Sequence, residues 1–438
     1  MNNRIIVGLA VLFFAVLSLP AAWAESGRKN VILIIGDGCG HNTLYAAADY
    51  VTGEPQGFPF QKWTHLGCST YAINGGYNPE TIWKTFDAHR ENPTDSAASG
   101  SAINTGKKTK SGRISTDENG DPVETFAEMC HKNGFATGTV TSVGISHATP
   151  ATVAAHDLSR GNGQVIFHNM LFESNLDVMI GSGHPIRRDN CDIRDERRAK
   201  YQSYGPNEED WKKIESGELP EGFVFVDSKE GFQKIASGEV PPPRKLLGLT
   251  NKGSITYNLK GQPASEKMPT LAEISLAALA VLNQSEKGFY LQIEEGVIDW
   301  TNHDRNLENN IAQCMALNDT VEAVCAWVEK NSSWDETLVI ITADHATGAF
   351  WGLKADEEGT LYATPVWKGK GNLAEGQYYS KGHTNELVPF YLRGRCAQKV
   401  DELVRGTDKR AAELYRFDGR YIDNTDIITL MRNAMGIE

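Results

Sequence analysis

The stretch Val31-Ile-Leu-Ile-Ile-Gly-Asp37-Gly38 is an apolar run that ends on an aspartate. A short run without polar residues predicts a strand that is buried on both faces, which is typical of a parallel sheet. In α/β proteins the carboxyl edge of such a sheet carries the chemistry. The stretch therefore predicts the fold class and, at Asp37, a first site residue.

Other apolar runs alternate along the chain with segments of helical character. The strand candidates are Val31–Ile35, Thr137–Val143, Asp177–Ile180, Gly288–Ile293, Thr337–Thr342 and Leu387–Leu392. The helix candidates include Val123–Asn133, Thr270–Asn283 and Ile311–Lys330. This alternation predicts an α/β fold with a mostly parallel central sheet that is covered by helices on both faces.

The segment of residues 184–268 differs from its surroundings because it is rich in charge, glycine and proline, including Pro241-Pro-Pro243. We interpret it as an insert near the mouth of the site, with small elements of its own such as Ser254–Leu259. The insert could shape access to the site or a subunit contact, and a passive surface excursion is the alternative. We expect residues 25–438 to form one domain that contains this insert.

Three later segments place carboxylates and imidazoles in metal-ligand patterns. Their residues are Glu294, Asp299 and His303; Asp344 and His345; and His383. Each segment alone has an ordinary explanation, because a polar pair after a strand can be a turn and an i, i+4 pair can lie on a helix surface. Together, carboxylates and imidazoles suit zinc, and sets of oxygen ligands favour magnesium. The combination predicts a multi-metal hydrolase.

A serine supplies a candidate nucleophile in Thr94-Asp95-Ser96-Ala97-Ala98. Asp95 or Ser96 could cap a helix, which would place Ser96 near the positive end of the helix dipole. A serine hydroxyl needs a base or a metal to become nucleophilic at neutral pH. Two close metal ions could activate this oxygen and also stabilise a leaving oxygen.

In these motifs the chain resembles the alkaline phosphatase family, from about Asn30 to about Gly394. The motifs occur in the family's order: a metal aspartate after the first strand, Asp-Ser-Ala, His-Ala-Thr-Pro with a later arginine, Glu-x-x-x-x-Asp-x-x-x-His, Asp-His, and a late Gly-His-Thr. The resemblance implies an alkaline-phosphatase-like α/β fold and a site that holds two zinc ions and one magnesium ion.

The resemblance also implies a role for each matching residue. Ser96 would be phosphorylated during turnover, and Arg160 would bind the substrate phosphate. Asp37 would bridge one zinc and the magnesium. The implied ligands are Thr149 and Glu294 for magnesium; Asp299, His303 and His383 for one zinc; and Asp344 and His345 for the other.

Two positions near these ligands depart from the commonest bacterial pattern. His147 stands where many members have an aspartate, and Trp300 stands where they have a lysine. We expect both residues to lie beyond the metal ligands and to affect magnesium affinity and the retention of phosphate. Glu295 stands where a glycine is usual, and nothing in the sequence explains it.

The N-terminal sequence indicates the cellular location, and the net charge limits the possible partners. A basic start, an apolar stretch and Ala22-Trp-Ala24 predict a signal peptide over residues 1–24, and hence a periplasmic or secreted protein; an uncut tether is the alternative. A net charge of −13 argues against a nucleic-acid partner and an anionic membrane surface. After cleavage no membrane anchor is expected. A homodimer is one of the assembly states left open.

The function predicted from these features is hydrolysis of phosphate monoesters through a phosphoserine. A phosphodiesterase or a sulfatase of the same superfamily is an alternative, although Ser96 lacks a following Pro-x-Arg context and Arg160 suits a dianionic monoester. A non-catalytic periplasmic protein that binds metal or phosphate is a third reading. The natural substrate stays open.

Overall fold

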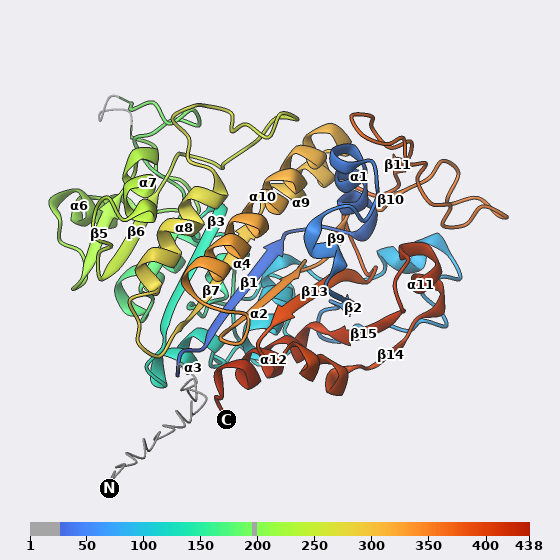
Figure 1. The fold of residues 1–438 in the computed structure, drawn as a ribbon, viewed down its shortest axis with the longest axis horizontal. Coiled ribbons are helices and arrows are strands. Elements are labelled where there is room, and N and C mark those ends of the chain that lie inside the picture. The colour runs from blue at the N-terminus through green and yellow to red at the C-terminus, as the bar shows by residue number, and fades with distance from the viewer. Residues whose placement is uncertain (1–26, 195–198) are drawn as a thin grey trace, which may run out of the picture.

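An eleven-stranded sheet forms the centre of the computed structural model, which describes residues 27–194 and 199–438 (Figure 1). The strand order is β14-β15-β2-β13-β8-β1-β7-β3-β4-β6-β5. The predicted first strand, β1 (Asn30–Gly36), lies between β7 (Phe289–Glu295) and β8 (Thr337–Thr342) and is parallel to both. Every residue of β1 is buried, as its uninterrupted apolar sequence predicts.

The sheet is parallel on one side of β1 and mixed on the other. Beyond β7 it continues in parallel through β3 (Ala136–Gly144), β4 (Val178–Ser182), β6 (Lys245–Leu249) and β5 (Phe223–Val226). Beyond β8 lie β13 (Val388–Gly394), β2 (Thr64–Ser69), β15 (Arg420–Asp423) and β14 (Gly406–Thr407). Only β13 and β14 run against the others, so the predicted mostly parallel sheet is confirmed.

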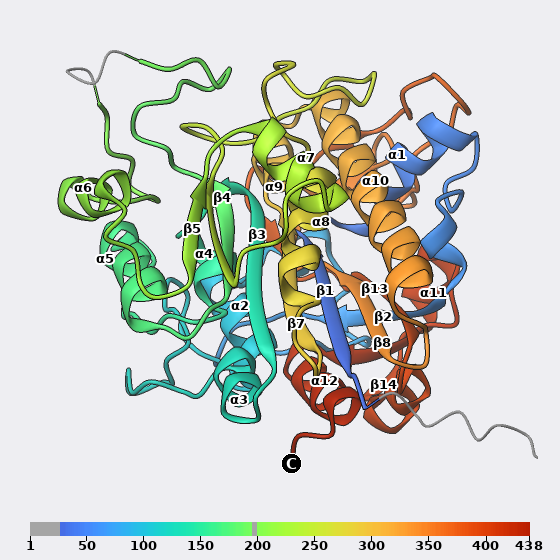
Figure 2. The ribbon, with the colours of Figure 1, turned by 60° about the vertical axis from the view of Figure 1, so that its left-hand side comes forward.

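Helices cover both faces of the sheet (Figures 1 and 2). Alternate residues of β7 identify the two layers, because the Phe289 ring packs against Trp327 while the Tyr290 ring packs against Phe126. One layer contains α1 (His41–Thr52), α7 (Lys229–Ser237), α8 (Leu271–Leu282) and α10 (Leu307–Asn331). The other contains α2 (Ser96–Thr105), α3 (Phe126–Lys132), α4 (Ala148–Ala151) and α12 (Ile427–Met435).

Shorter elements complete the chain. The remaining helices are α5 (Gly163–His168), α6 (Glu208–Ser216), α9 (Val297–His303) and α11 (Lys409–Tyr415). Four short strands, β9 (Ala346–Thr347), β10 (Phe350–Trp351), β11 (Gln377–Tyr378) and β12 (His383–Thr384), form two small ladders outside the main sheet. The pairing of β12 with β9 brings His383 opposite Thr347 and close to His345.

Most predicted elements are present, and two predictions need correction. The helix expected over 123–133 begins only at Phe126, because Thr125 and Glu128 form a capping box. No strand forms at Ser254–Leu259, where the structure has only an isolated bridge between Tyr257 and Pro263.

The segment 184–268 is more closely integrated than a separate insert would be. Its strands β5 and β6 extend the central sheet, and its helix α7 packs against α8. One part of it, at Tyr204, reaches the site, where the tyrosine ring lies 4.9 Å from the ring of His147.

The predicted signal peptide at residues 1–24 falls outside the described residues. Within 27–194 and 199–438, no helix combines the length and the apolar character that crossing a membrane requires.

Candidate active site

The carboxyl ends of three adjacent strands bring the first predicted ligands together. Asp37 follows β1, Glu294 lies near the end of β7, and Asp344 follows β8. The register pairs Ile35 of β1 with both Glu294 and Thr342, so the three carboxylates meet at one edge of the sheet. This is the edge at which the apolar run predicted a site.

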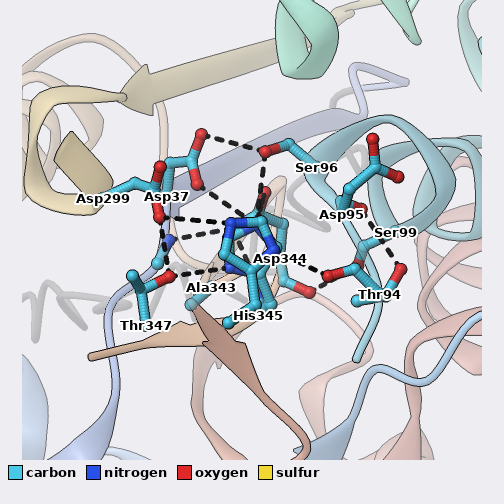
Figure 3. Close-up of polar contacts among 12 residues, drawn as sticks. Asp37, Thr94, Asp95, Ser96, Ser99, Asp299, Ala343, Asp344, His345 and Thr347 are labelled. Carbon is cyan, nitrogen blue, oxygen red and sulfur yellow. Dashed lines mark hydrogen bonds and ion pairs between the residues drawn. The ribbon is translucent and has the colours of Figure 1, made fainter. Parts of the chain in front are cut away.

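Ser96 lies at the start of α2 and faces Asp37 and His345 (Figure 3). Its Oγ is 3.2 Å from His345 Nε2 and 3.4 Å from Asp37 Oδ2. Asp95 caps the helix, accepting a hydrogen bond from the Ala98 N–H at 3.0 Å. The predicted nucleophile is therefore buried at a helix N-terminus, beside an imidazole and a carboxylate that could bind a metal with it.

Asp299, His303 and His383 form a compact group, as their predicted common zinc requires. His303 Nε2 lies 3.2 Å from Asp299 Oδ2 and 3.2 Å from His383 Nε2, and His383 Nε2 lies 3.6 Å from Asp299 Oδ1. Zinc–ligand bonds of 2.0–2.1 Å in a tetrahedron place ligand atoms about 3.3 Å apart. The spacing of the three side chains therefore suits one zinc ion.

Asp37, Asp344 and His345 form a second group of potential ligands. His345 Nε2 lies 3.5 Å from Asp37 Oδ1 and 3.4 Å from Asp344 Oδ2. Burial raises the pKa of Asp344 to about 7, and burial followed by the charge of Asp344 raises the pKa of Asp37. Among the described residues neither Asp37 Oδ1 nor Asp344 Oδ2 has a hydrogen-bond partner. Buried carboxylates of this kind fit a cation.

The imidazoles of these two groups share one arrangement. Nδ1 of His303 contacts the carbonyl of Lys381, Nδ1 of His383 lies 2.8 Å from the carbonyl of Thr94, and Nδ1 of His345 lies 3.2 Å from Thr347 Oγ1. An oxygen acceptor holds the proton on Nδ1 and leaves the Nε2 lone pair free for a metal. All three rings therefore present Nε2 to the site.

A third group contains Asp37, Glu294 and His147. Burial raises the pKa of Glu294 to about 7, although the nearby hydroxyl groups of Thr141 and Thr149 oppose the shift. The predicted magnesium residues Asp37, Thr149 and Glu294 are thus close together. The structure adds His147, which was expected to lie beyond the ligands and instead lies within ligand distance of both carboxylates.

Arg160 lies over the start of α2. Its Nη1 donates to Asp95 Oδ2 at 3.1 Å, and its Nη2 donates to His147 Nε2 at 3.1 Å. Burial, followed by the charge of Arg160, lowers the pKa of His147 to about 3, so this imidazole is neutral. Trp300 is 37% exposed, and its ring lies 6.1 Å from that of His147.

Several residues at the site were not predicted. Thr347 Oγ1 donates to Asp299 Oδ1 at 2.6 Å and also contacts His345, so it orients ligands of two groups. In the sequence, the position of Thr347 two residues after His345 could have indicated its place at the site. Tyr204 comes from the segment 184–268, and nothing in the sequence around it indicates this location.

Glu295 does not belong to the site. Its side chain points to the opposite face of β7 from Glu294, where Ser142 Oγ donates to Oε1 at 3.0 Å and the Val297 N–H donates at 3.2 Å. Burial raises the pKa of this carboxyl to about 8. Cys39, two residues after Asp37, is also outside the site, because its side chain is buried in the hydrophobic core.

The parallel sheet, the buried carboxylates and the converging imidazoles define a metal-dependent α/β hydrolase. A family model described as "Alkaline phosphatase" matches residues 28–388. Alkaline phosphatase 4 of Bacillus subtilis (strain 168) is 30% identical over 353 residues, which are 78% of this chain and 66% of that protein. The chain thus spans about two thirds of the length of this curated relative. The chain belongs to the alkaline phosphatase family.

Solved structures share the fold. The cold-active alkaline phosphatase from a psychrophilic Shewanella species has a TM-score of 0.66 at 22% identity, covering 93% of this chain and 100% of that one. A variant of the alkaline phosphatase from the Antarctic bacterium TAB5, described with Mg bound, has a TM-score of 0.62 at 23% identity, covering 94% and 99%.

Proposed function

We propose that this chain is an alkaline phosphatase that hydrolyses phosphate monoesters through a phosphoserine at Ser96. The observation that carries the proposal is the place of Ser96 Oγ, 3.2 Å from His345 Nε2 and 3.4 Å from Asp37 Oδ2. Arg160 is anchored by Asp95 over the same helix start. A nucleophile, potential metal ligands and a phosphate-binding cation therefore share one space.

The proposed reaction has two displacements. The Arg160 guanidinium binds two phosphoryl oxygens. Ser96 Oγ forms a bond to phosphorus, the bond to the alcohol oxygen breaks, and the alcohol leaves with a proton. Water then attacks the phosphoserine, which releases inorganic phosphate and restores the hydroxyl. When bound, the metal ions would supply charge stabilisation for the attacking and leaving oxygens.

We propose two zinc ions and one magnesium ion per chain. The imidazole and carboxylate ligands of two groups support zinc, and the oxygen-rich third group supports magnesium. The proposed ligands are Asp299, His303 and His383 for one zinc; Asp37, Asp344 and His345 for the other; and Asp37, Thr149 and Glu294 for magnesium, with His147 beside them.

The test compares three aryl esters with the purified protein in zinc and magnesium. p-Nitrophenyl phosphate should be hydrolysed, and bis(p-nitrophenyl) phosphate and p-nitrophenyl sulfate should be hydrolysed far more slowly. A preference for the diester or the sulfate would overturn the proposed substrate class. No hydrolysis of any ester by zinc-loaded protein would favour the non-catalytic reading.

We also propose export, with cleavage after Ala24. The support is the basic, apolar and small-residue pattern of residues 1–24. N-terminal sequencing of the protein from the periplasm or medium should begin at Glu25, and an intact N-terminus in a membrane fraction would contradict cleavage. Light scattering on the same material would decide between a monomer and a homodimer.

A further inference from the structure

Arg160 and His147 share a hydrogen bond whose direction is fixed by chemistry. Arg160 Nη2 lies 3.1 Å from His147 Nε2. A guanidinium group has donors only, so the imidazole nitrogen must accept. The other arm of the fork, Nη1, donates to Asp95 Oδ2 at 3.1 Å. In this arrangement each Nη atom of Arg160 is held by a protein acceptor, and one of the two N–H groups of Nη2 is directed at His147 instead of at a phosphoryl oxygen.

His147 also belongs to the group of ligands formed with Asp37 and Glu294. A neutral imidazole has one acceptor nitrogen. A cation between these residues would use that lone pair directly, or a water on the cation would donate to it. The other ring nitrogen then carries the proton and cannot accept from Arg160. The hydrogen bond to Arg160 and the interaction with a cation therefore exclude each other.

The neighbours of His147 hold its ring in place. The rings of Tyr204 and Trp300 meet it edge to face, at 4.9 Å with an interplanar angle of 79° and at 6.1 Å with 82°. Tyr204 is itself closely packed, because a Cβ at Gly144 would lie 2.6 Å from the Tyr204 Cβ. The ring therefore has little freedom to turn, and the end of the Arg160 side chain is the group that moves.

We propose that His147 is a positioning residue that withholds Arg160 Nη2, and that a cation bound beside Asp37, Glu294 and His147 releases this nitrogen to the substrate phosphate. The inference rests on the proposed function, because it takes phosphate as the ligand of Arg160. It adds that a cation in the third group would favour phosphate binding in two ways: by its own positive charge and by freeing Arg160 Nη2. The affinities for magnesium and phosphate are then linked, each ligand strengthening the other by the same factor.

The experiment measures binding of inorganic phosphate by calorimetry, with zinc-loaded protein in the absence and presence of magnesium. The central variant is His147→Phe, which keeps an aromatic ring between Tyr204 and Trp300 and removes the acceptor. Without magnesium, His147→Phe should bind phosphate roughly two- to tenfold more tightly than wild type, the factor for one net hydrogen bond. His147→Ala gives the same comparison if the larger ring does not fit.

Thr149→Val is the matched control, because it weakens magnesium binding without contacting Arg160. Without magnesium its phosphate affinity should equal that of wild type. Magnesium should tighten phosphate binding in wild type by a larger factor than in His147→Phe, where only the direct attraction between the two ions remains.

Unchanged or weaker phosphate binding by both His147 variants, at full zinc content and without magnesium, would overturn this inference. That result would leave the proposed function standing if wild type still hydrolyses p-nitrophenyl phosphate. Failure of metal-loaded wild type to hydrolyse this ester would overturn the proposed function instead, so the two failures are distinguishable.

Discussion

Ser96 Oγ lies 3.2 Å from Nε2 of His345, and the opposite side of that imidazole, Nδ1, lies 3.2 Å from Thr347 Oγ1. The proposed metal ligand His345 therefore lies between the proposed nucleophile and a threonine that is two residues further along the chain. Because His345 is completely buried, this contact depends on the packing of the sheet edge.

Ser96→Ala should abolish the covalent phosphoenzyme, since no other hydroxyl takes the place of Oγ between Asp37 and His345 in the described structure. Slow hydrolysis by water at the metals could persist. Acid quenching with labelled phosphate should trap label on Ser96 in wild type. Label on another residue, or unchanged turnover by Ser96→Ala, would contradict the assignment.

His383→Ala should lower bound zinc by about one equivalent per chain, because the site would keep only two protein ligands and such sites bind zinc poorly. Metal analysis after gel filtration measures the loss. His131→Ala is a suitable control, since His131 is an exposed residue of α3, which leads into the first residue of β3, whereas the site lies at the carboxyl ends of the strands. Full zinc content in His383→Ala would refute the proposed ligand set.

Trp300→Lys should tighten the binding of inorganic phosphate and slow turnover. A lysine there would bring a cation near the phosphate, and one charge-assisted hydrogen bond at a partly exposed position corresponds to about tenfold in affinity. If product release limits the rate, tighter binding lowers it. Competitive inhibition by phosphate measures the change, and Trp300→Leu controls for loss of the ring.

The double variant Trp300→Lys with His147→Asp should also hold magnesium more tightly, because a carboxylate replaces a neutral imidazole beside Asp37 and Glu294. Magnesium exchange followed after dilution should become slower than in wild type. If phosphate and magnesium affinities both stay unchanged, these two positions do not control product release.

His156→Gln should destabilise the protein more at pH 5.5 than at pH 9. Burial opposes protonation of His156, but its hydrogen bond to Glu128 at 3.1 Å raises the pKa above the ordinary value of 6.5. A raised pKa means that the stabilisation is fully present below 6.5 and is lost as the pH rises through the folded-state value. The pair is partly exposed, so the difference should be on the order of 0.5–1 kcal/mol. Urea unfolding at the two pH values measures it; equal effects would show that the charge contributes nothing.

The sequence was most informative where apolar runs end on charged residues. β1, β7 and β8 were predicted from such runs, and parallel pairing alone brings Asp37, Glu294 and Asp344 together. The compact group of Asp299, His303 and His383 was less accessible from the residues themselves, because it depends on the small ladder between β9 and β12. The resemblance to a family, rather than periodicity, supplied that connection.

The remaining features depend on contacts that local patterns do not encode. β5 and β6 are apolar but only four and five residues long, and the polar segment around them hides such short runs. The contact of Tyr204 with His147 joins residues from different parts of the chain, and it is produced by backbone packing against Gly144. The proximity of His147 to Asp37 follows from the turn after β3. The conformation of this turn cannot be predicted from its residue types.

The central position of β1 determines the order in which parts of the protein unfold locally. Asp37 follows a strand with five strands on each side, so hydrogen exchange of the β1 amides requires opening of the most protected part of the sheet. Edge segments such as β5 and β14 can fray while this strand stays closed. The aspartate proposed to join two metal sites is therefore attached where local opening is rarest, and mild denaturant should disturb the rim of the site well before it releases that ligand.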